Sequence, residues 1–177
     1  MRSADLTPLA RDVMKLPASL GLIFFSLVGA YVFSVLPWSG TWLLARPDLM
    51  LLVLLFWALH EPRSVGQGLA FMMGLLMDVS DSMLLGQHAL VYVMAVFGAQ
   101  VLRVRILTFP LPEQTLHVMG LTMAASGLML LLNMALGAEF PGPSFFISPV
   151  IAAMLWAPVN WILYLSSVRR RRGDTAQ

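Results

Sequence analysis

The sequence contains no cysteine and very little charge. Without cysteine, the chain can form neither disulfide bonds nor thiolate metal sites. Only 11% of its 177 residues are charged, whereas about 25% is usual for a soluble domain. Hydrophobic residues make up 59%, and the mean hydropathy is +0.81. These values predict an all-α integral membrane protein. A net charge of +2 gives no sign of a nucleic-acid partner.

Long polar stretches are also absent, and six apolar segments follow one another with short connections. They lie at about 17–36, 42–59, 65–80, 84–102, 115–136 and 145–167. We expect them to form one six-helix transmembrane domain over 17–168, followed by a basic tail at 169–177. The first segment is close to the ~20 residues that a span needs and lacks a cleavage site, so we expect it to be retained. Residues 1–16 are either an interfacial helix or a frayed tail.

Basic residues fall almost entirely on one side of these segments. If six spans alternate from a cytoplasmic N-terminus, ten basic residues are cytoplasmic: Arg2, Arg11, Lys15, Arg63, Arg103, Arg105 and Arg169 to Arg172. Arg46 alone lies outside. Because cytoplasmic loops carry an excess of lysine and arginine, this division predicts six spans with both termini in the cytoplasm.

The second and third segments are short for a membrane span. Only 11 residues separate Asp48 from His60. They make about 17 Å of helix, against a hydrocarbon core of about 30 Å. Either these helices cross a locally thinned bilayer, or they carry polar groups such as Arg46, Asp48 and Asp78 into the bundle.

Residues suited to catalysis are scarce. A nucleophile needs a base that it can meet, and no histidine obviously pairs with Ser126. Asp78 and Asp81 could share a helix face as an acid–base pair. However, Asp78 follows Leu-Leu-Met and not the Gly-x-Gly of intramembrane aspartyl proteases. The sequence also shows no cluster of metal ligands and no glycine-rich phosphate loop. We therefore expect no enzymatic activity, cofactor or metal.

Polar residues gather near the outer ends of the second, third and fourth segments: Arg46, Asp48, Asp78, Asp81 and His88. Pairing Arg46 with Asp48 or Asp78 would lower the cost of holding either charge at membrane depth. The group is either a surface that docks another membrane protein, the mouth of a cavity, or a set of interfacial side chains that reach water. Separately, Gly66, Ala70 and Gly74 are spaced four apart, which favours close helix packing on the third span.

Four motifs occur in order in this part of the chain: Arg46-Pro47-Asp48, Trp57-Ala58-Leu59 before a proline-containing turn, Gly74-Leu75-Leu76-Met77-Asp78, and Leu85-Gly86-Gln87-His88-Ala89-Leu90. In order and spacing they resemble the MreD family of rod shape-determining membrane proteins. The length, the six segments and the basic C-terminus extend the resemblance to nearly the whole chain. Beyond about Arg105 it rests only on generic apolar helices.

This resemblance implies a non-catalytic scaffold for cell-wall elongation in the inner membrane of rod-shaped bacteria. It implies MreC as a partner and, through MreC, the MreB filament, the RodA glycosyltransferase and a class-B penicillin-binding transpeptidase. It also implies a fold similar to the membrane substrate-binding subunits of energy-coupling-factor transporters. The expected partner-binding or structural cluster is then Arg46, Pro47, Asp48, Asp78, Gly86, Gln87 and His88, and Asp78→Ala is expected to spare insertion but weaken partner binding.

The alternative is a small-molecule binding or transport subunit with a pocket open to the outside. A buried cavity of about 300 Å³ or more between Asp48, Asp78 and His88 would favour this function. Side chains filling that region would exclude it, whereas the scaffold predicts lateral, lipid-facing partner surfaces and no closed ligand cavity.

Overall fold

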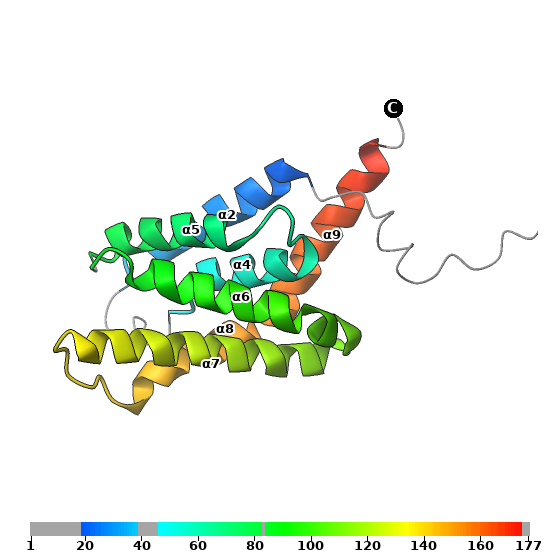
Figure 1. Ribbon diagram of the computed structural model, residues 1–177. Coiled ribbons are helices and arrows are strands. Elements are labelled where there is room, and N and C mark those ends of the chain that lie inside the picture. Colours follow the sequence, from blue (N-terminus) through cyan, green and yellow to red (C-terminus); the bar gives the residue numbers. More distant parts are fainter. Residues whose placement is uncertain (1–18, 39–45, 83, 175–177) are drawn as a thin grey trace, which may run out of the picture.

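The structure, a computed structural model, describes residues 19–38, 46–82 and 84–174, and it contains no strand within these ranges. Its helices are α2 (Leu20–Val35), α4 (Leu49–His60), α5 (Gln67–Ser80), α6 (Gln87–Thr108), α7 (Leu111–Ala135), the 3₁₀ helix η1 (Pro143–Phe146), α8 (Ile147–Met154) and α9 (Trp156–Asp174). The prediction of an all-α architecture is confirmed. Figure 1 shows α4, α5, α6 and α7 running roughly along one direction, with α9 inclined to them. The expected segment 1–16 lies outside the described residues.

Three stretches are long and apolar enough to cross a membrane: α6, α7 and the combined stretch Pro143–Leu165. Three helices are shorter, namely α2, α4 and α5. The last expected segment is divided at Leu155, between α8 and α9. Pro158 explains the position of this break, because a proline ring clashes with the carbonyl group four residues earlier, here that of Met154. The helix then continues through the expected tail as far as Asp174.

The centre of the molecule is α4. Each residue from Met50 to Leu59 is buried, and α4 packs against α2, α6, α7, α8 and α9. A helix that is apolar on all sides is expected to be surrounded by other helices. With 12 residues, α4 is about 18 Å long, whereas α7 with 25 residues is about 37 Å long. The central helix is therefore much shorter than its neighbour.

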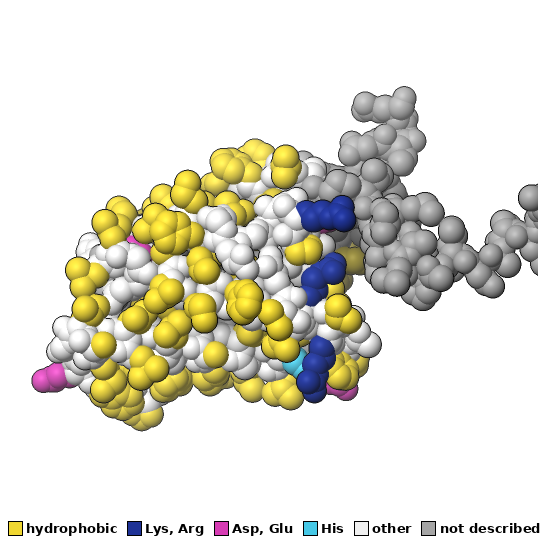
Figure 2. All heavy atoms as spheres, viewed as in Figure 1, with side chains coloured by type: hydrophobic (Ala, Val, Ile, Leu, Met, Phe, Trp, Pro, Cys, Tyr) yellow, Lys and Arg dark blue, Asp and Glu magenta, His cyan; other side chains and the backbone are white. Residues whose placement is uncertain are grey.

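The two ends of the bundle differ in charge. At one end, here called the Arg103 end, α4 and α6 finish while α5 and α7 begin, and the side chains of Arg63, Arg103 and Arg105 belong to this end. Figure 2 shows the blue basic side chains gathered there. At the opposite end, here called the Arg46 end, α4 and α6 begin. Among the described side chains, the uneven division of arginines agrees with the count along the sequence, and the six-span, N-in orientation stays a prediction.

Helices α5 and α6 pack closely through small residues. Ala70 is fully buried, and a Cβ atom added to Gly74 would overlap the backbone of Ala89 and His88. Gly66 takes no part in this contact. It is the N-cap of α5, and a Cβ atom added there would meet no atom within 4 Å. Of the three small residues, Gly74 lies against α6, Ala70 is buried, and Gly66 lies just before the first residue of α5.

Candidate functional site

The carboxylate of Asp78, near the end of α5, caps the N-terminus of the neighbouring helix α6. Its Oδ2 accepts a hydrogen bond from the backbone N–H of Gly86 at 2.7 Å, and its Oδ1 accepts one from the backbone N–H of His88 at 2.8 Å. The N-cap of α6 is Gly86, whose φ of 106° suits glycine and which has no side chain to cap the helix. Asp78 supplies the missing acceptor. Because Asp78 is fully buried, it is not available to a partner protein.

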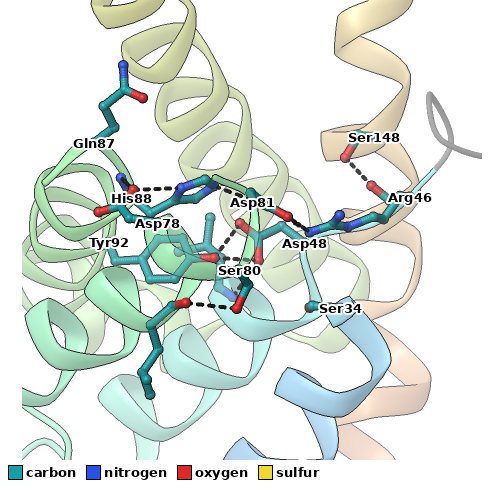
Figure 3. Close-up of polar contacts among 12 residues, drawn as sticks. Ser34, Arg46, Asp48, Asp78, Ser80, Asp81, Gln87, His88, Tyr92 and Ser148 are labelled. Carbon is teal, nitrogen blue, oxygen red and sulfur yellow. Dashed lines mark hydrogen bonds and ion pairs between the residues drawn. The ribbon is translucent and has the colours of Figure 1, made fainter. Parts of the chain in front are cut away.

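His88 and Arg46 connect Asp78 to a second aspartate, Asp81. The Nδ1 atom of His88 lies 2.9 Å from Oδ1 of Asp78, and its Nε2 lies 3.8 Å from Oδ2 of Asp81. The Nη2 atom of Arg46 donates to both carboxylate oxygens of Asp81 at 3.1 Å. Figure 3 shows the imidazole ring between the two aspartates. Of the pairings considered from the sequence, Arg46 with Asp48 or with Asp78, neither is formed among the described residues, where Arg46 pairs with Asp81.

Asp48 has a different role at the start of α4. Its Oδ1 accepts the backbone N–H of Leu51 at 2.9 Å, which caps the helix. Both of its carboxylate oxygens lie 2.9 Å from the hydroxyl of Tyr92, which donates to them. Tyr92 stands one helical turn beyond His88, and the two rings meet edge to face at 5.8 Å. His88 and Tyr92, which lie on one face of α6, therefore contact Asp78 and Asp48, respectively.

The other predicted residues lie around this network. Pro47 is buried immediately before the N-cap Asp48. Gln87 donates to the side-chain oxygen of Asn133 on α7 at 3.1 Å. The backbone carbonyl of Arg46 accepts a bond of 2.6 Å from the hydroxyl of Ser148 on α8. The structure thus brings together the predicted residues of the Arg46 end from three helix termini.

A cavity of about 400 Å³ opens beside this network. Its walls come from α4, α5, α6, α7, α8 and η1. They include Arg46, Asp48, Asp81, His88, Tyr92, Thr122, Ser126, Asn133, Phe145 and Ser148 among 17 residues. The charged residues Arg46 and Asp48, which precede α4, share this cavity with residues of α7 from Thr122 to Asn133. The volume exceeds the value that would favour the alternative function. Asp78 is not among the lining residues, so the cavity lies beside Asp48 and His88 and not between them and Asp78.

Three residues of the site were not among those predicted from the sequence, namely Tyr92, Asn133 and Ser148, and Asp81 was expected only as a member of the wider polar group. Tyr92 carried a usable signal, because residues four apart on a helix share a face and Tyr92 follows His88 by four. Asn133 and Ser148 are more than 40 residues away from their partners along the chain, and no local pattern connects them. Within the described ranges, no three His, Asp or Glu residues are placed to hold a metal ion.

Comparisons with known proteins agree with the resemblance seen in the motifs. The family model described as "rod shape-determining protein MreD" matches residues 14–166. A protein of Haemophilus influenzae named "Rod shape-determining protein MreD" is 40% identical over 70 residues, which cover 40% of this chain and 42% of that relative. The match spans less than half of the relative's length. No solved structure matches the chain, and the expected similarity to energy-coupling-factor subunits stays a prediction.

Proposed function

Because the chain belongs to the MreD family of rod shape-determining membrane proteins, we propose that it is a non-catalytic scaffold of the bacterial cell-wall elongation complex. The match of the family model over residues 14–166 is the observation that carries this proposal, and it supports a role in determining rod shape. In this proposal the chain crosses the inner membrane six times with both termini in the cytoplasm. The Arg103 end then faces the cytoplasm and the Arg46 end faces outward.

The proposed partner is MreC, which would connect the chain to MreB, RodA and a class-B penicillin-binding transpeptidase. At the Arg46 end, the ion pair of Arg46 and Asp81 is suited to docking because its side chains are 20% and 23% exposed. Asp78 is fully buried and caps α6, so its proposed role is structural. This changes the expectation from the sequence, in which Asp78 itself contacted the partner.

A charge exchange tests docking at this pair. Arg46→Asp and Asp81→Arg each remove the ion pair, whereas the double variant restores it with reversed charges. If the pair serves only stability, the double variant recovers rod shape and MreC co-purification in cells depleted of the native protein. If a partner recognises the charges, the double variant is stable but recovers neither. Normal shape and normal MreC recovery in all three variants would overturn the docking role.

A second candidate function is a small-molecule binding or transport subunit, which the cavity of about 400 Å³ favours. Purification of the complex from native membranes separates the two candidates. Recovery of a single-span protein with a periplasmic domain supports the scaffold. Recovery of an ATPase module instead supports transport.

A further inference from the structure

The cavity at the Arg46 end has a charged mouth and a mostly apolar interior. Arg46, Asp48, Asp81 and His88 line it near the starts of α4 and α6. Along α7 its wall runs from Asn133 to Thr122, a separation of 11 residues that corresponds to about 16 Å of helix. Apolar side chains such as Ala125, Met129 and Ala152 also line it. An elongated cavity of this kind fits an amphiphile better than a compact polar solute.

The charges at the mouth are not balanced. Arg46 and Asp81 neutralise each other through their ion pair. Asp48 forms no ion pair with an arginine or lysine among the described residues. Its Oδ2 receives only a share of the single hydroxyl proton of Tyr92. An ionised carboxylate has about four acceptor positions, so Asp48 retains capacity for a positively charged donor.

Hydrogen-bond donors for an anionic group are present at the same mouth. A guanidinium group has five N–H donors, and within the described structure Arg46 engages its ion-pair partner through Nη2. Asn133 uses its side-chain oxygen to accept from Gln87, which leaves its amide N–H donors. The mouth therefore offers an acceptor for a cation and donors for an anion within one opening.

From these observations we propose that the cavity binds an amphiphile whose head group joins a primary ammonium to a phosphate, as in an ethanolamine phospholipid. The ammonium would donate to Asp48, the phosphate oxygens would accept from Arg46, and an apolar chain would lie against Ala125 and Ala152. This inference gives the second candidate function a ligand class. It does not depend on the scaffold role.

Binding can be measured on the purified full-length chain by native mass spectrometry. The probes are dihexanoyl phosphatidylethanolamine, dihexanoyl phosphatidylglycerol and dihexanoyl phosphatidylcholine, which share their acyl chains and differ in head group. We expect the ethanolamine lipid to bind at least about tenfold more tightly than the other two. Equal binding of the three lipids would overturn the proposal, and because no cells are involved, it would leave the results on cell shape unaffected.

Two variants locate the binding. Asp48→Asn keeps an N-cap acceptor but removes the charge, so it should abolish the preference for the ethanolamine lipid. Ala125→Phe fills the cavity and should weaken binding of all three lipids, whereas Ala124→Phe, at an exposed neighbouring position on α7, should not. Unchanged preference in Asp48→Asn would contradict the proposal. If Ala125→Phe lowers recovery of a partner protein and the unmodified chain shows no lipid selectivity, the cavity binds a side chain of that protein. This result would also overturn the proposal.

Discussion

The carboxylate of Asp78 accepts the backbone N–H of His88 at 2.8 Å and also lies 2.9 Å from Nδ1 of the same residue. One aspartate near the end of α5 thus fixes both the first turn of α6 and the orientation of the imidazole ring. The ring in turn lies between Asp78 and Asp81, at the edge of the cavity. This contact holds the ends of α5 and α6 together at the Arg46 end, where partner docking and ligand binding are proposed.

Loss of the Asp78 carboxylate should destabilise the fold. Asp78→Ala leaves the N–H groups of Gly86 and His88 without their acceptor, and each unsatisfied buried group costs about 1–3 kcal/mol. We expect a clearly lower thermal midpoint for the purified variant in detergent. Asp81→Asn is the matched control, since a partly exposed ion pair contributes only about 0–1 kcal/mol. Equal midpoints for the two variants would refute the capping role.

Enlargement of Gly74 should separate α5 from α6. A Cβ atom at this position overlaps the backbone of Ala89, and backbone cannot move aside as a flexible side chain can. Overpacking of this kind typically costs about 1–3 kcal/mol, so Gly74→Ala should lower the thermal midpoint. Gly68→Ala on the same helix meets no atom within 4 Å and should be neutral or slightly stabilising. Equal thermal midpoints for Gly74→Ala and Gly68→Ala would show that α5 and α6 are not in close contact at Gly74.

Removal of the Tyr92 hydroxyl should weaken the start of α4. Tyr92→Phe deletes the donor to Asp48, at an expected cost of about 1 kcal/mol. A double-mutant cycle with Asp48→Ala, measured by thermal unfolding, isolates this interaction. We expect Tyr92→Phe to have little further effect once Asp48 is replaced, whereas Asp48→Ala still removes the cap of α4 in the Tyr92→Phe background. Additive losses would show that the two side chains act independently.

Thiol labelling can test the orientation, because the chain contains no cysteine of its own. Ala138→Cys lies in the exposed turn after α7, at the Arg46 end, and Thr108→Cys is exposed at the Arg103 end. If the N-terminus is cytoplasmic, a membrane-impermeant maleimide added to spheroplasts labels Cys at position 138 only. Permeabilised cells, in which both positions should react, provide the control. Labelling at position 108 alone would reverse the proposed orientation.

The sequence by itself determined the class of the protein and the position of its helices. Hydropathy and charge depend only on residues that are neighbours in the chain. The apolar segments, the unequal distribution of arginines between the two sides and the short second segment could therefore be predicted. Gly74 and Ala70 were also found, because a spacing of four places residues on one helix face. Asp48 and His88 were recognised as unusual because charge next to an apolar run is expensive.

The tertiary structure alone decided which of these residues meet. Asp81 pairs with Arg46 while Asp78 accepts hydrogen bonds from the start of α6, and no local pattern distinguishes these two roles. The cavity is lined by residues of α4, α5, α6, α7, α8 and η1, which only the folded bundle brings together around Arg46 and Asp48 at the start of α4. Both features depend on the relative positions of helix ends that are distant in the chain, and only packing of the whole bundle sets those positions.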